Sequence, residues 1–217
     1  INNIMLLPSN RIILVDDNEN DLTKLSTVFY ENGIGCRKLK YDSMYNEPLT
    51  GVRIAFFDIN LGGYADETSR NANLKSAISS YISKDNGCFI LVFWTSRIEW
   101  IDSFIDFINR DEDEMKAYIH PYHITHIDKS EFLDRRKRLQ DKLEEIYNLP
   151  SVKILFEFEN LILEESWNTL TRLVDIIPHE EKWGDSSLFE QNCKSVFASI
   201  ACQNSGFNNA KENPDNR

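Results

Sequence analysis

The sequence predicts an α/β fold: a doubly wound, five-stranded parallel sheet followed by an α-helical extension. Over the first 148 residues, short runs rich in β-branched and aromatic residues alternate with polar segments of helix length. The strongest of these runs are apolar without alternation, which is typical of parallel strands that are buried on both faces. Strands that alternate with helices form βαβ units with right-handed crossovers, so these runs are expected to make one sheet.

Each strand is expected where an apolar run ends in a polar residue. The predicted strands lie at residues 11–15, 34–39, 52–57, 88–94 and 123–127. The predicted helices, which carry apolar residues at helical spacing, lie at residues 20–32, 68–83, 98–108 and 131–147. Gly33 follows the first helix and suits its C-terminal cap. Only a turn or two is expected between the second and third strands, because Pro48 interrupts the short segment there.

Pro150 marks a change of pattern. Beyond it, residues 152–177 carry apolar side chains at helical spacing on more than one face. A possible capping box, Ser187-x-x-Glu190, begins a last predicted helix that runs through Cys202. The predicted organisation is an α/β domain at residues 1–148, a helical extension at 149–202 and an Asn-rich, disordered tail at 203–217.

The protein is acidic, with 217 residues and a formal net charge of -11. This balance argues against binding to nucleic acid or to an anionic membrane surface, because Lys and Arg must supply that attraction. From Pro150 onward there are 6 Lys plus Arg and 11 Asp plus Glu, a net charge of -5, which disfavours a DNA-binding output.

Compartment and redox state follow from similar observations. No apolar stretch approaches the roughly 20 residues that span a bilayer. No signal-peptide pattern is visible at the start, so a cytoplasmic protein is expected. The four cysteines form no C-x-x-C pair and are predicted to be reduced and buried.

Polar residues gather where the predicted strands end. The first strand ends in Asp16 and Asp17, the third in Asp58, the fourth in Thr95 and the fifth in Lys129. In an open parallel sheet of order 2-1-3-4-5 these ends converge on one edge, where ligands bind. Three crowded carboxylates repel one another, so the site needs a cation, and Mg2+ suits such oxygen ligands.

This set of residues suits phosphoryl transfer onto a carboxylate. Asp58 can act as the nucleophile and form an acyl phosphate. Lys129 and the hydroxyl of Thr95 can then bind phosphoryl oxygens beside the metal.

From about Arg11 to Tyr147 the pattern resembles the receiver domain of bacterial two-component response regulators. In that family an acidic pair ends the first strand, a phosphoacceptor aspartate the third, Thr or Ser the fourth and Lys the fifth. The matching residues here are Asp16, Asp17, Asp58, Thr95 and Lys129. Asn60 lies where the family donates a backbone carbonyl to Mg2+.

The resemblance implies a flavodoxin-like sheet and a protein that receives a signal rather than an enzyme. It implies that a histidine kinase or a phosphotransfer protein phosphorylates Asp58 with Mg2+ bound. The metal ligands would be Asp16, Asp17, Asp58 and the backbone carbonyl of Asn60. The output is expected to pass through protein–protein contacts, with a homodimer through the helical extension as one route.

Several residues depart from the family pattern. Ser130 follows Lys129 where the family usually has a proline after a cis bond, His126 stands where an aromatic residue often moves on activation, and Trp94 beside Thr95 is unusually bulky. These departures indicate a divergent receiver.

Two alternatives stay open. One is a degenerate receiver that serves as a phosphorylation-independent interaction scaffold. The other is a phosphatase of the haloacid-dehalogenase type, which also uses a strand-end aspartate with Mg2+. That family places a second acid two residues after the nucleophile, where this sequence has Asn60.

Overall fold

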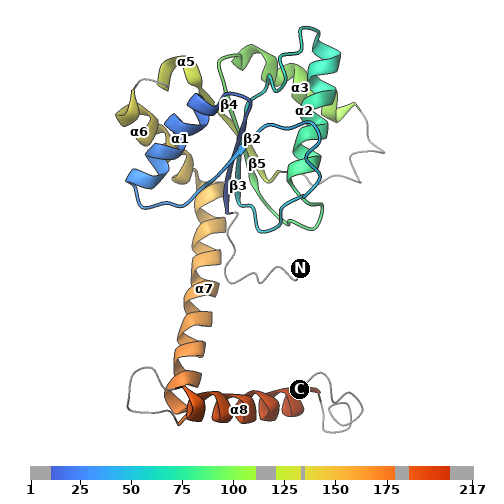
Figure 1. The fold of residues 1–217 in the computed structure, drawn as a ribbon. Helices are drawn as coiled ribbons and strands as arrows, with labels where there is room; N and C mark the ends of the chain where they lie inside the picture. Colours follow the sequence, from blue (N-terminus) through green and yellow to red (C-terminus); the bar gives the residue numbers. More distant parts are fainter. Residues whose placement is uncertain (1–10, 111–120, 133–134, 179–185, 206–217) are drawn as a thin grey trace. The chain divides into compact units, whose positions relative to one another are not determined.

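The computed structural model describes residues 11–110, 121–132, 135–178 and 186–205. It contains a five-stranded parallel sheet of order β2-β1-β3-β4-β5, which confirms the predicted fold class (Figure 1). The strands are β1 (Ile12–Asp16), β2 (Arg37–Lys40), β3 (Ile54–Phe57), β4 (Ile90–Thr95) and β5 (His123–Asp128).

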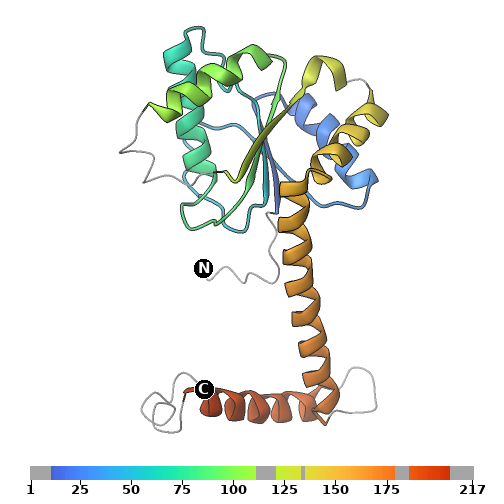
Figure 2. The ribbon, with the colours of Figure 1, turned by 180° about the vertical axis from the view of Figure 1, so that it is seen from behind.

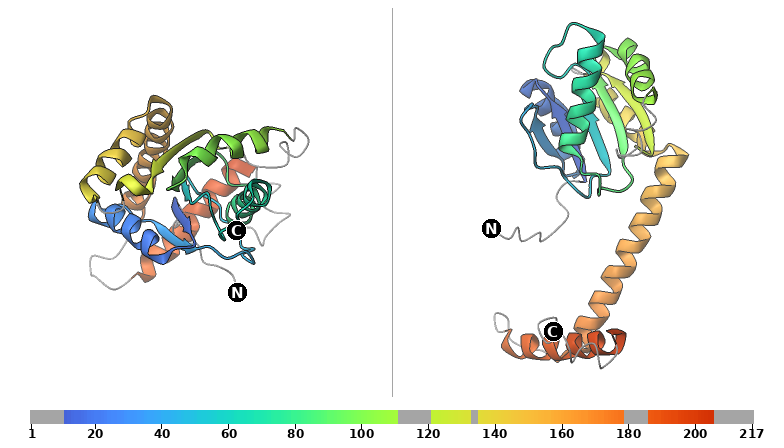
Figure 3. Two further views of the ribbon diagram at one scale, coloured as in Figure 1. Left: turned by 90° about the horizontal axis from the view of Figure 1, so that it is seen from above. Right: turned by 90° about the vertical axis from the view of Figure 1, so that its right-hand side faces the viewer.

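Helices cover both faces of the sheet. Those in the sheet-containing part of the chain are α1 (Glu19–Glu31), α2 (Glu67–Tyr81), η1 (Ile98–Trp100), α3 (Ile101–Asn109), α5 (Lys129–Phe132) and α6 (Arg136–Tyr147). Helices α1 and α6 lie on one face, and α2 and α3 on the other (Figures 2 and 3). The sheet is therefore doubly wound, as predicted.

The strand register brings the carboxyl ends of the strands to one edge. Val15 pairs with Phe57 and Phe57 with Phe93, while Thr95 pairs with Asp128. Strands β1, β3 and β4 are buried along their whole length. Burial on both faces explains why these runs are apolar without alternation.

Helix α1 shows how local residues set the boundaries beside this edge. The side chain of Asn18 accepts a hydrogen bond from the backbone N–H of Asn20 and so caps the start of the helix. At its other end Gly33 has φ 71°. Its N–H bonds to Tyr30 and that of Ile34 to Phe29, which is a Schellman motif.

The segment between β2 and β3 contains no helix, in line with the sequence prediction. Aromatic side chains cover the sheet there instead. The rings of Tyr45 and Tyr81 stack with centroids 4.2 Å apart. The hydroxyl of Tyr81 donates to the carbonyl of Lys40 and accepts from the N–H of Asp42. Side chains of α2 thereby hold this segment on the sheet.

Two sequence predictions are corrected. The expected single helix at 131–147 is two helices, α5 and α6, and α5 already begins at Lys129 because Asp128 caps it. The cysteines are free thiols but they are not buried: Cys88 is exposed, and the other three are intermediate. Cys88 is exposed because β4 begins only at Ile90, two residues after it.

The chain divides into two compact units, Ile1–Ile154 and Leu155–Arg217. Helix α7 (Pro150–Ile176) begins at the end of the first unit, and α8 (Ser187–Ser205) belongs to the second. Helix α8 continues three residues into the segment predicted to be a disordered tail, and the rest of that segment lies outside the described residues. No described helix is long and apolar enough to cross a membrane.

Candidate functional site

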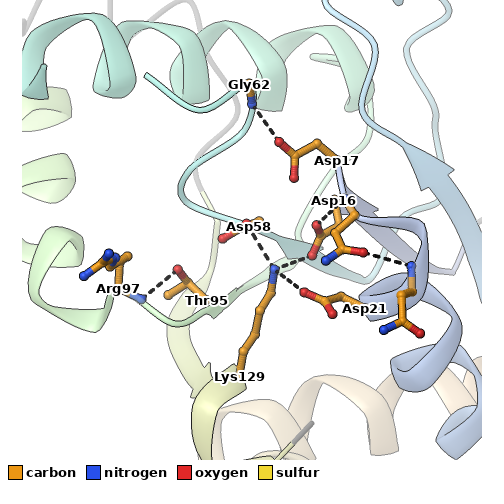
Figure 4. Close-up of polar contacts among 10 residues, drawn as sticks. Asp16, Asp17, Asp21, Asp58, Gly62, Thr95, Arg97 and Lys129 are labelled. Carbon is orange, nitrogen blue, oxygen red and sulfur yellow. Dashed lines mark hydrogen bonds and ion pairs between the residues drawn. The ribbon is translucent and has the colours of Figure 1, made fainter. Parts of the chain in front are cut away.

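The carboxyl edge of the sheet brings four of the predicted site residues together. Asp16 is the last residue of β1 and Asp17 follows it, Asp58 follows β3, and Lys129 follows β5 as the first residue of α5. Figure 4 shows the side chains of Asp16, Asp58 and Lys129 meeting, with Asp17 beside them and directed toward Gly62. Residues that are far apart in sequence meet here because parallel strands end at the same edge.

Lys129 is the centre of this cluster. Its side chain is only 5% exposed, and its Nζ lies 2.5 Å from Asp16 Oδ2 and 3.0 Å from Asp58 Oδ2. Asp16 is fully buried. Taking an ammonium and a carboxylate out of water is costly, so this pair depends on close contact and on further hydrogen bonds. The backbone N–H of Asn18 supplies one such bond to Asp16 Oδ1, at 2.8 Å.

Asp21 is a fourth carboxylate that the sequence reasoning missed. It lies in the first turn of α1, is 8% exposed, and places Oδ2 3.4 Å from Lys129 Nζ. Three carboxylates thus surround the three N–H donors of one ammonium. The signal was its spacing: Asp21, Leu25 and Val28 lie one turn apart on the buried face of α1.

Asp17 completes the acidic cluster from the exposed side. One oxygen from each of Asp16, Asp17 and Asp58 lies within 4.8 Å of the others. The backbone N–H of Gly62 donates to Asp17 Oδ2 at 3.2 Å. Gly62 has φ 77°, a backbone conformation that residues other than glycine rarely adopt.

The loop after Asp58 is held from α2 as well. The side-chain amide of Asn73 donates to the carbonyl of Leu61 at 2.8 Å, and its oxygen accepts from the hydroxyl of Tyr41 at 2.7 Å. Ile59 and Leu61 are both buried, so apolar packing also fixes this loop.

Burial and the neighbouring charges shift two pKa values in the cluster. Burial raises the pKa of Asp16 to about 6, against the opposing effect of Lys129, and Asp58 raises it further. Burial lowers the pKa of Lys129, but the carboxylates of Asp58 and Asp16 outweigh it, so the net shift is upward. Lys129 therefore stays charged at neutral pH.

The donor set fits a hard divalent cation such as Mg2+. Asp16, Asp17 and Asp58 offer three carboxylates at the spacing of shared metal ligands. Counting Asp21, the cluster holds four carboxylates and one ammonium, so it has a surplus of negative charge that a cation would offset.

The proposed roles of Asn60 and Thr95 stay predictions. The carbonyl of Asn60 accepts a hydrogen bond from Gly63 N–H, and its side-chain Oδ1 is buried with no hydrogen-bond partner among the described residues. Thr95 is fully buried, and its Oγ1 accepts from the N–H of Arg97 at 3.1 Å. That bond shapes the turn after β4 and leaves the hydroxyl proton of Thr95 free to donate.

The turn after Lys129 differs from the pattern of the resemblance. No described peptide bond is cis, so Lys129 and Ser130 are joined by a trans bond. The N–H and hydroxyl of Ser130 both donate to Asp128 Oδ1, at 2.8 and 2.6 Å. An Asp–Ser cap thus starts a helix at Lys129, and Ser130 stands where the family usually has a proline.

No protein-family model matches the sequence, and no curated protein matches it. Solved structures that match include the N-terminal domain of a response regulator/sensory box/GGDEF three-domain protein from Carboxydothermus hydrogenoformans. It has 14% identity and a TM-score of 0.28, over 62% of this chain and 96% of that chain. Another contains the yeast Spc42 trimeric coiled coil fused to a further solved structure, with 11% identity and a TM-score of 0.29, over 76% of this chain and 99% of that chain. Matches at such low identity do not assign a chemistry to this site, so its function is proposed from the strand order and from the geometry of the side chains.

Proposed function

We propose that the sheet-containing unit is a phosphoacceptor receiver domain, phosphorylated on Asp58 by a histidine kinase or a phosphotransfer protein when Mg2+ is bound. The observation that carries the proposal is the position of the Asp58 carboxylate. It lies 3.0 Å from the ammonium of Lys129 and within 4.8 Å of two further carboxylates, at the carboxyl edge of a 2-1-3-4-5 sheet. A nucleophilic carboxylate beside a metal site and a fixed cation suits phosphoryl transfer.

In the proposed transfer, an oxygen of Asp58 forms the new O–P bond as the P–N bond of a phosphohistidine breaks. The electron pair of that bond leaves with the imidazole. Lys129 shifts one of its hydrogen bonds from Asp58 to a phosphoryl oxygen, and the hydroxyl of Thr95 donates to another. Asp16, Asp17 and Asp58 would hold a Mg2+ ion, which would supply positive charge for the phosphoryl oxygens.

The proposal is of a phosphoacceptor and not of a phosphatase. In a haloacid-dehalogenase site, a second acid two residues after the nucleophile acts on the leaving group. The corresponding residue here is Asn60, and the acidic pair comes from β1 and not from β3. Asn60 cannot serve as a general acid or base, so the phosphoryl group on Asp58 is expected to be hydrolysed slowly.

The test uses the full chain, Mg2+ and a small phosphodonor such as acetyl phosphate, with intact mass as the readout. We expect the mass of one phosphoryl group on the wild type and none on Asp58→Asn. The matched control is Asp85→Asn, an exposed aspartate between α2 and β4, which should be modified like the wild type. Hydroxylamine should remove the group, because it cleaves acyl phosphates.

Each other outcome points elsewhere. No modification, together with no binding of beryllofluoride, would leave the phosphorylation-independent scaffold as the better account. Continuous release of phosphate over many turnovers would favour the phosphatase. The downstream signal is proposed to pass through protein–protein contacts, with a homodimer through the helical extension as one route.

A further inference from the structure

Helix α7 exposes an unusual amount of apolar surface. Every residue from 160 to 172 is exposed, and nothing among the described residues covers this stretch. We call its large apolar side chains, which are 37% to 62% exposed, the α7 apolar surface; they are Phe158, Leu161, Ile162, Leu163, Trp167, Leu170 and Val174. A contiguous surface of this kind on a protein marks an interaction site.

These side chains form two faces of one helix. At 3.6 residues per turn, Phe158, Leu161 and Ile162 centre on one direction, and Leu163, Trp167 and Val174 on another roughly 165° away. A polar stripe lies between them on one side of the helix, with Glu157, Glu164, Asn168, Thr171 and Asp175. A helix with two apolar faces suits a bundle, where each helix contacts two neighbours.

The helix also needs this packing to be stable. Together, Phe, Ile, Trp, Thr and Val make up 10 of the 27 residues of α7, and they have lower helix propensity than Ala or Leu. Most helix stability in proteins comes from packing of an apolar face rather than from propensity. An exposed stretch of this composition is therefore expected to be covered in the functional state.

We propose that a second copy of this chain covers the α7 apolar surface, so that two α7 and two α8 helices form a four-helix assembly. The area matches. At roughly 100 Å² for each half-exposed large side chain, its members expose about 700 Å² per copy, and stable interfaces bury about 800 Å² per partner. Two copies also supply the two neighbours that each α7 requires, which one copy cannot.

A groove on α7 marks where the contact begins. It has a volume of about 610 Å³ and is lined only by residues of α7, including Leu161, Ile162, Leu170 and Leu173. Its lining also includes Glu165, Ser166 and Thr169, and it runs along the side of the helix that carries Leu161 and Ile162. In a symmetric dimer the same surface meets itself, so the side chains that line the groove also fill that of the partner.

The test measures the mass of the full chain in solution over a range of concentrations, without phosphodonor or Mg2+. Its outcome is then independent of the chemistry at Asp58. We expect the wild type to reach twice the monomer mass of 25.3 kDa at micromolar concentration. Ile162→Asp with Leu170→Asp should weaken association at least about a hundredfold, because two buried aliphatic side chains are lost.

The matched control adds the same two carboxylates to the polar stripe, as Asn168→Asp with Thr171→Asp, and should still dimerise. A wild type that is monomeric at every concentration overturns the proposal. So does a groove variant that dimerises normally, or a control that dissociates equally.

Hydrogen exchange on the wild type gives a readout that needs no variant. Backbone amides of residues 160–172 should be protected above the dissociation constant and should exchange faster on dilution below it. Protection that does not change with concentration counts against a second copy.

Discussion

Replacing Lys129 by Met removes an ammonium but keeps an unbranched side chain of similar length. In the wild type this ammonium lies 2.5 to 3.4 Å from the carboxylates of Asp16, Asp58 and Asp21, with its side chain 5% exposed. Removing one partner of a buried ion pair leaves uncompensated charge and costs about 3–5 kcal/mol. Since domains are stable by only about 5–15 kcal/mol, we expect a variant close to the limit of folding.

Urea unfolding in the presence of EDTA measures this loss. Adding Mg2+ should stabilise the variant more than the wild type, because the metal replaces the missing positive charge; a ligand at a hundred times its dissociation constant adds about 2.7 kcal/mol. The control is Lys142→Met, which removes an exposed pair with Glu145 and should cost less than about 1 kcal/mol. A Lys129→Met loss as small as the control, or no extra gain with Mg2+, would refute this account of the cluster.

Further predictions concern pH and the glycines. Because the pKa of Asp16 is raised to about 6, the protonated carboxyl stabilises the fold below about pH 4, and this stabilisation is lost as pH rises through 6. Over that range the metal-free wild type should lose about 3 kcal/mol of unfolding free energy relative to Asp16→Asn, measured by urea unfolding. Mg2+ affinity, measured by calorimetry, should fall below pH 6 as protons compete. Gly62→Ala should cost about 1 kcal/mol and weaken Mg2+ binding, whereas Gly63→Ala, with a similar φ of 68°, should cost stability alone. Thermal unfolding should show Gly33→Ala destabilised by about 1 kcal/mol and Gly35→Ala nearly unchanged.

The sequence predicted those features that depend on local pattern. Buried parallel strands are continuous apolar runs, which are easy to recognise in a sequence. The predicted bounds of β1, β3 and β4 therefore lie within two residues of the observed ones. The convergence of Asp16, Asp58 and Lys129 followed from strand order alone.

Features that depend on three-dimensional context were missed. Asp21 belongs to the site only because α1 turns that side of the helix toward the sheet. Its spacing from Leu25 and Val28 indicated a buried position, but a charged residue is normally expected on the exposed side. The separate helix α5 depends on the cap that Asp128 makes with Ser130, and no Gly or Pro marks the break after it. Cys88 was placed inside an apolar run, but pairing with β3 begins only at Ile90.

The loop that follows Asp58 is anchored by hydrogen bonds at three closely spaced residues. Asp58 itself is tied to β1 through its N–H, Leu61 is tied to α2 by Asn73, and Gly62 is tied to the end of β1 by Asp17. Only two residues separate the first anchor from the second, so this loop cannot swing aside like a hinged lid. A group that arrives at Asp58 and displaces the loop must also pull on the body of α2 or strain the end of β1. Displacement of this loop therefore strains a helix or the end of a strand and does not open a flap.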